Sequence, residues 1–179
     1  MNLQATTSLI VINFIVFLVG DFIMNHHMFF TYFGLNYLFF SGFYWQVFTT
    51  MFLHGSLMHL VMNMAVLYQF GSILERYLGG IKFTLIYLIG GILTSALSLV
   101  YTYLMINNGI VINLVGASGA ISVLLGLLAY LNIYMRKGLF LAIILISFAP
   151  MLVGIKVGWY AHLIGFGLGY LYAKIGLRS

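Results

Sequence analysis

The chain has 179 residues, of which 64% are hydrophobic, 17% aromatic and only 5% charged. This composition excludes a disordered chain and an ordinary soluble domain, and it is typical of a membrane protein with several spans. The net charge of +5 arises from seven basic residues that are scattered along the chain. Because they form no continuous basic stripe, we expect the lipid bilayer and no nucleic acid as a partner.

Six apolar segments approach the length of roughly 20 residues that crosses the hydrocarbon core. In chain order, we predict spans at residues 6–24, 57–74, 83–104, 117–134, 139–154 and 159–175. The fifth is short and contains Pro150, the only proline, near its end. No basic region precedes the first span, so we expect it to be retained rather than cleaved as a signal peptide. The spans and their connections use the whole chain, which predicts one all-α membrane domain over residues 1–179.

The connection between the first two spans is rich in aromatic side chains. Tyrosine and tryptophan favour the membrane interface, and a segment too irregular to span can lie in it. We therefore expect this loop to anchor at the interface and to shield whatever lies beneath it. The aromatic residues are Phe29, Phe30, Tyr32, Phe33, Tyr37, Phe39, Phe40, Phe43, Tyr44 and Trp45.

The second predicted span begins with polar residues. His54 precedes it, and His59 and Asn63 are four residues apart, on one face of a helix. One interpretation is a polar pair that joins helices. The other is a set of uncharged hydrogen-bond donors for an oxyanion.

Gly116, Ala117, Ser118 and Gly119 surround the start of the fourth span. Small residues are common where membrane helices pack closely, so this short motif alone also fits a packing stripe. Near the start of the sixth span lies His162, an ionisable residue that needs a cavity or a partner within a membrane. Small residues follow it at a spacing of four, including Gly165 and Gly169. If the two stripes pack together, Ser118 and His162 meet, and the histidine can accept the serine proton.

Basic residues predict the topology, because they concentrate in cytoplasmic loops. If both termini are cytoplasmic, Lys156 alone lies outside and the other basic residues all lie inside. Spans two, four and six then begin at the outer face, which puts His59, Ser118 and His162 at a similar depth. The residues expected inside are Arg76, Lys82, Arg136, Lys137, Lys174 and Arg178.

Other hydrolytic chemistries lack the residues they require. There is no cysteine, and one aspartate cannot form a carboxylate pair. Glu75 follows Asn63 by about 18 Å along a helix, too far to orient His162, whereas Asp21 lies near the outer end of the first span and stays open as a partner. We expect a Ser118–His162 dyad held by helix packing, with no metal and no cofactor.

Taken together, these motifs resemble the rhomboid intramembrane serine proteases. The resemblance runs from Trp45-Gln46, through His54, His59 and Asn63, to the Gly71-x-x-x-Glu75-x-x-x-Gly79, Gly116-Ala117-Ser118-Gly119 and Ala161-His162-x-x-Gly165-x-x-x-Gly169 motifs. It implies a compact six-helix protease of the bacterial plasma membrane that cuts single-span proteins near the outer face. It also implies that Ser118 is the nucleophile, His162 the base, and His59, Asn63 and the Ser118 amide the oxyanion donors.

Two positions depart from the family pattern. Gln46 stands where many members have arginine, and Ser122 stands where many have an aromatic ring that packs on the histidine. A smaller residue at 122 leaves His162 less tightly held unless another ring takes its place. Two alternatives to a protease stay open: a non-catalytic protein of this fold that binds transmembrane clients, and a small transporter.

Overall fold

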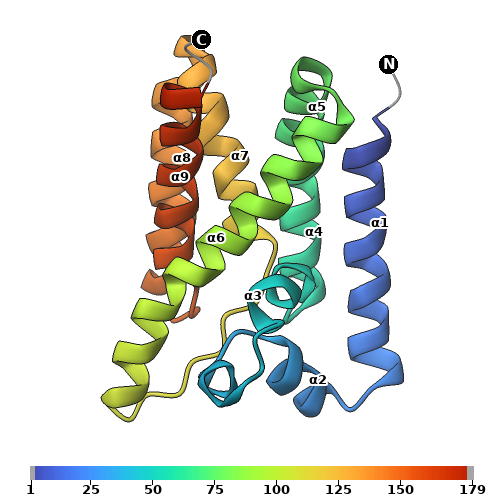
Figure 1. Ribbon diagram of the computed structural model, residues 1–179, viewed down its shortest axis with the longest axis vertical. Helices are drawn as coiled ribbons and strands as arrows, with labels where there is room; N and C mark the ends of the chain where they lie inside the picture. The colour runs from blue at the N-terminus through green and yellow to red at the C-terminus, as the bar shows by residue number, and fades with distance from the viewer. Residues whose placement is uncertain (1–2, 177–179) are drawn as a thin grey trace.

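The computed structural model describes residues 3–176, and within this range the chain folds almost entirely into helices (Figure 1). No strand forms there beyond an isolated antiparallel bridge between Leu35 and Leu114. The all-α class that the sequence predicts is therefore confirmed. The α-helices are α1 (Gln4–Leu18), α2 (His26–Phe33), α3 (Gln46–Thr49), α4 (Leu57–Val66), α5 (Ser72–Leu78), α6 (Gly80–Asn107), α7 (Ser118–Leu131), α8 (Ile133–Leu152) and α9 (Trp159–Gly176).

Four continuous helical stretches are long and apolar enough to cross a membrane: Gln4–Ile23, Leu57–Leu78, Gly80–Asn107 and Ile133–Leu152. The first joins α1 to a π-helical turn, and the second joins α4 to α5 through a similar turn, Leu67–Gly71. Helix α7 is apolar but has only 14 residues, and α9 has 18. Several apolar helices of this length indicate a multi-pass membrane protein.

Helix α8 begins at Ile133 rather than at Leu139, where the sequence analysis placed the start of the fifth span. The Asn132 side chain caps the helix by accepting hydrogen bonds from the amides of Tyr134 and Met135. The Arg136 guanidinium also donates to the carbonyls of Ala129 and Tyr130 at the end of α7. Apolarity marks the membrane-spanning part of a helix, whereas these polar contacts start the helix several residues earlier.

Helix α7 lies at the centre of the molecule and contacts α4, α6, α8 and α9. Every residue from Ala120 to Ala129 is buried. The outer helices show the opposite pattern: α8 exposes Leu141 and Leu145 but buries Ser147 completely. Large apolar side chains on the outside suit contact with lipid, while the interior holds both apolar and polar groups.

Glu75 links the start of α1 to the end of α5. Its carboxylate accepts hydrogen bonds from the amides of Ala5 and Thr6, at 2.9 and 2.8 Å. These amides belong to the first turn of α1 and have no acceptor within their own helix. Glu75 therefore caps α1.

Both ends of the described chain lie at the same end of the molecule, as do the α5–α6 and α7–α8 turns (Figure 1). Helices α2 and α3 lie at the opposite end. The elements at the first end contain Arg76, Lys82, Arg136, Lys137 and Lys174, whereas Lys156 lies in the α8–α9 connection at the other. Arg178, which the sequence analysis grouped with the first set, lies outside the described residues.

Candidate active site

Ser118 is the first residue of α7, and its position depends on the turn before it. Gly116 has φ +125°, a conformation that side chains other than hydrogen rarely allow. Its amide donates to the Thr50 carbonyl at 3.0 Å, and the Thr50 hydroxyl donates to the Leu114 carbonyl. As the first helical residue, Ser118 has an amide N–H without an acceptor inside the helix.

The first loop holds this turn from the other side. The Leu35 amide donates to the Leu114 carbonyl at 3.0 Å, and the Leu114 amide donates to the Leu35 carbonyl at 2.9 Å. Gln46 is completely buried, and its side-chain nitrogen donates to the carbonyls of Thr31 and Tyr32. Its side-chain oxygen accepts from the Asn36 amide at 3.2 Å. An uncharged amide at position 46 therefore supports the loop through hydrogen bonds alone.

Ser118 and His162 lie within hydrogen-bond distance of each other. The Ser118 Oγ is 3.0 Å from the His162 Nε2, and the histidine is buried while the serine is partly exposed. They belong to α7 and α9, whose motifs the sequence analysis expected to face each other. A hydroxyl this close to an imidazole nitrogen can pass its proton to the ring if that nitrogen is unprotonated.

Glycines allow α7 and α9 to approach closely enough for this contact. A Cβ on Gly165 would meet the Gly119 carbonyl oxygen, and one on Gly169 would meet the Val123 carbonyl oxygen. A Cβ on Gly126 of α7 would likewise meet the Phe166 carbonyl oxygen. Such backbone contact requires residues without side chains. Gly119, Gly165 and Gly169 thus set the spacing of the helices that bear Ser118 and His162.

His59 and Asn63 lie on α4, next to the same turn. The His59 ring contacts Gly116, where an added Cβ would be 2.8 Å from the His59 Cε1 and 3.7 Å from the Ser118 Oγ. The Asn63 side-chain nitrogen donates to the His59 carbonyl at 2.9 Å. The expected oxyanion residues therefore share one face of α4, and His59 lies beside the turn that leads to Ser118.

His54 is buried in the segment that precedes α4. Its ring meets the His59 ring edge to face, with the centroids 5.0 Å apart. Burial, with a smaller effect from neighbouring His59, lowers the pKa of His54 to about 3. Through this ring contact, His54 lies against one of the expected oxyanion residues.

Neither acidic residue contacts His162. The Asp21 carboxylate lies 3.5 Å from the His26 Nε2, and Glu75 caps α1 as described above. The side-chain bonds of His162 go instead to Ser118 and to Ser147 of α8, whose Oγ is 3.3 Å from the His162 Nδ1. No three His, Asp or Glu side chains gather within residues 3–176 in a way that could hold a metal.

Ser147 is the site residue that the sequence analysis missed. It belongs to no motif and has no characteristic spacing from Ser118 or His162. The one available signal was a hydroxyl in an otherwise apolar segment, residues 139–148. At position 122, the serine hydroxyl donates to the Ser118 carbonyl at 2.7 Å, so this position supplies no ring to His162.

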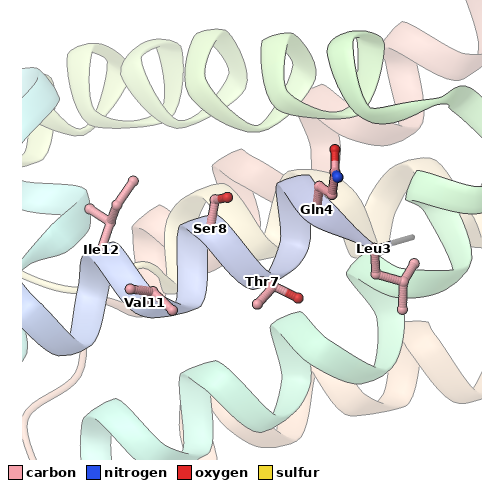
Figure 2. Close-up of a pocket in the computed structure, with 6 residues that line it drawn as sticks. All are labelled: Leu3, Gln4, Thr7, Ser8, Val11 and Ile12. Carbon is pink, nitrogen blue, oxygen red and sulfur yellow. The ribbon is translucent and has the colours of Figure 1, made fainter.

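A shallow hollow on the surface lies away from this site. It is lined by residues at the start of α1, from Leu3 to Ile12 (Figure 2). None of the residues near Ser118 and His162 takes part in it. We assign it no role in chemistry.

Comparison with known proteins agrees with these motifs. A Rhomboid domain family model matches residues 41–179. "RHOMBOID-like protein 6, mitochondrial" of Arabidopsis thaliana is 39% identical over 140 residues, covering 71% of this chain and 43% of the relative. "Rhomboid protease GluP" of Bacillus subtilis is 37% identical over 102 residues, covering 57% of this chain and 18% of the relative.

For a further relative, the match spans a larger share of the relative's own length. "Putative rhomboid protease YdcA" of Bacillus subtilis is 29% identical over 146 residues, covering 78% of this chain and 70% of the relative. The chain spans less than half of the Arabidopsis relative and about a fifth of GluP. The family model nevertheless covers the glycine turn, the two α4 residues, Ser118 and His162 in one continuous match. With the helical fold and this arrangement, the match places the chain in the rhomboid family.

Proposed function

We propose that this protein is an intramembrane serine endopeptidase that uses Ser118 as nucleophile and His162 as general base. The observation that carries the proposal is the 3.0 Å contact between the Ser118 Oγ and the His162 Nε2. No carboxylate is needed to make this contact, because α7 and α9 pack at their glycines. Membership of the rhomboid family, with relatives named as proteases, supports the same reaction.

The arrangement supplies each step of acyl transfer. The Ser118 Oγ attacks the carbonyl carbon of the scissile bond while its proton passes to the His162 Nε2. The imidazolium then gives that proton to the leaving amine nitrogen, which leaves an ester on Ser118. Water attacks the ester with the same histidine as base and releases the acid product.

An oxyanion forms in each half of the reaction and requires hydrogen-bond donors. The Ser118 amide begins a helix and has no intrahelical acceptor, so it is one candidate donor. Asn63 is another, because only one of its two side-chain N–H groups is needed for its bond to His59. The His59 ring, beside Gly116, is the third.

We further propose that six helices cross the membrane within a single domain over residues 1–179. Helices α7 and α9 would then join the four longer spans, with α7 shielded from lipid by its neighbours. Both termini would be cytoplasmic, and the aromatic first loop would lie in the outer interface. The site would then open toward the outer face of a bacterial plasma membrane, where the polar side chains around Ser118 admit water.

The substrates we propose are single-span membrane proteins cut in or near the transmembrane segment. A partly exposed serine at membrane depth can reach only a peptide bond that enters the bilayer. Two other functions compete with this one: the binding of transmembrane clients without cleavage, and transport of a small solute. The direct contact between Ser118 and His162 favours catalysis over both, because neither alternative requires that pair.

The test is cleavage of a generic single-span substrate by the purified full chain in detergent, beside Ser118→Ala. We expect cleavage products with the unaltered protein and none with the variant. A fluorophosphonate probe applied to the same samples should label Ser118 covalently, because it reacts with an activated serine whatever the substrate.

The outcomes separate the proposed functions. Product from both proteins would exclude Ser118 as the nucleophile. Probe labelling without cleavage would keep the activated serine and reject the chosen substrate class. Absence of both product and label, in a folded protein, would overturn the protease and leave client binding or transport.

A further inference from the structure

Ser147 lies beside the His162 ring nitrogen that does not contact Ser118. Its side chain is completely buried on α8, and its Oγ is 3.3 Å from the His162 Nδ1. The Nε2 on the other side of the ring faces the Ser118 Oγ. The imidazole is therefore held between two serine hydroxyls that come from different helices.

The hydrogen bonds of Ser147 have a definite direction. Its hydroxyl donates to the Ile143 carbonyl, at 2.6 Å, because a carbonyl oxygen can only accept. The hydroxyl has one proton, so toward His162 its oxygen can act only as an acceptor. The hydrogen bond to His162 therefore requires a proton on Nδ1.

This direction decides which imidazole tautomer faces Ser118. A neutral imidazole has a single N–H, and if Nδ1 bears it, Nε2 presents a lone pair. A lone pair on Nε2 is what proton transfer from Ser118 requires. The opposite tautomer would direct an N–H at the Ser118 oxygen and could not accept its proton.

No other described group performs this task. Asp21 contacts His26, Glu75 caps α1, and position 122 has a serine in place of a ring. When His162 becomes an imidazolium, its Nδ1–H carries positive charge inside the protein. A hydrogen bond to that N–H becomes charge-assisted and strengthens, so the 3.3 Å resting contact gains most in the transition state.

We propose that Ser147 is a positioning residue that holds His162 in the Nδ1–H tautomer and stabilises the imidazolium. This proposal rests on the protease function proposed above. Ser147 exchanges no proton: the Ser118 proton moves to Nε2, the Nδ1 proton stays shared with the Ser147 oxygen, and the Nε2 proton passes to the leaving amine. A hydroxyl thus takes the place that an acid occupies in a Ser-His-Asp triad.

The test compares Ser147→Ala with Ser147→Thr in the purified full chain. Alanine removes the acceptor, whereas threonine keeps a hydroxyl that can still donate to the Ile143 carbonyl. We expect Ser147→Ala to lower kcat by about 10- to 100-fold, the scale of loss when a catalytic group is misplaced. KM should not change, and the rate of fluorophosphonate labelling at Ser118 should fall in parallel. Threonine should restore most of both rates.

Ser98→Ala is the matched control. Ser98 is also completely buried, and its hydroxyl donates to the Thr94 carbonyl four residues earlier at 2.7 Å, but it lies on α6 and makes no hydrogen bond to His162. We expect Ser98→Ala to keep kcat and the labelling rate. A loss equal to that of Ser147→Ala would show that removing any buried hydroxyl slows the enzyme, and it would overturn the proposal.

Nitrogen-15 NMR of the histidine-labelled protein reads the tautomer without any substrate. His162 should show a protonated Nδ1 in the unaltered chain. In Ser147→Ala, the proton distribution should shift from Nδ1 toward Nε2. A protonated Nε2 in the unaltered chain, or an unchanged kcat and labelling rate in Ser147→Ala, would overturn the role of Ser147. If the proposed protease function itself is wrong, the unaltered protein will neither cleave the substrate nor react with the fluorophosphonate probe. That result differs from a loss confined to Ser147→Ala.

Discussion

Asn63 has two side-chain N–H groups, and the structure commits one of them to the His59 carbonyl at 2.9 Å. The other is free to bind a developing oxyanion. This division would let one asparagine both stabilise α4 and serve as the proposed oxyanion donor. A hydrogen bond made only in the transition state affects kcat, whereas the bond within the helix affects folding.

Replacement of Asn63 by alanine should therefore lower kcat by about 10²- to 10³-fold, the usual cost of one lost oxyanion donor. The measurement is steady-state cleavage, with thermal unfolding recorded on the same samples. Asn13→Ala is the matched control, because Asn13 is buried on α1 and donates to the Leu9 carbonyl at 2.8 Å in the same four-residue geometry. Equal losses of kcat in the two variants would remove Asn63 from the oxyanion site.

At the scale of elements, the pairing of α7 with α9 determines the distance between Ser118 and His162. The two helices meet backbone to backbone at glycines, so their separation is set by the absence of side chains. Van der Waals packing is a main source of helix association in membranes, where the hydrophobic effect contributes little. A single methyl group at the contact must push the helices apart or distort them.

Gly169→Ala should accordingly lower the free energy of unfolding by about 1–3 kcal/mol, as expected for an overpacked contact. The new Cβ would meet the Val123 carbonyl and would be 2.9 Å from the Leu127 nitrogen. Gly167→Ala, two residues earlier on α9, adds a Cβ with no atom within 4 Å and should cause no loss. Thermal unfolding in detergent measures both. Equal stability of the two variants would contradict the close α7–α9 contact.

For the whole molecule, charge and helix arrangement give consistent views of orientation. The described basic residues other than Lys156 lie in elements at the end where both ends of the described chain lie, and the first loop lies at the opposite end. Positive residues concentrate on the cytoplasmic side of a membrane. The proposed cytoplasmic termini follow from this asymmetry.

Single-cysteine labelling tests that orientation without further engineering, because the chain has no cysteine of its own. In intact bacterial cells, a membrane-impermeant maleimide should label Lys156→Cys directly and Lys137→Cys only after lysis. Both positions are exposed. The reverse pattern would place the site at the cytoplasmic face and contradict the proposed topology.

Much of this protein could be predicted from the amino-acid sequence alone. Composition and the lengths of the apolar segments determined the class, since few compositions other than a membrane protein's reach 64% hydrophobic residues. The small-residue stripes predicted that the helices bearing Ser118 and His162 would pack together. Helix starts were predicted less well, because Asn132 and Arg136 begin α8 through polar contacts that hydropathy does not register.

The tertiary structure alone decided what holds His162. No spacing rule joins Ser147 to a histidine fifteen residues later on another helix, and a lone serine in an apolar segment fits many roles. The contact exists because α8 packs against α9. The hydrogen bond that Ser147 donates to the Ile143 carbonyl leaves its oxygen to accept from His162. Sequence determined which chemical groups were present, whereas the direction of their hydrogen bonds, and with it the tautomer, depends on the packing of three helices.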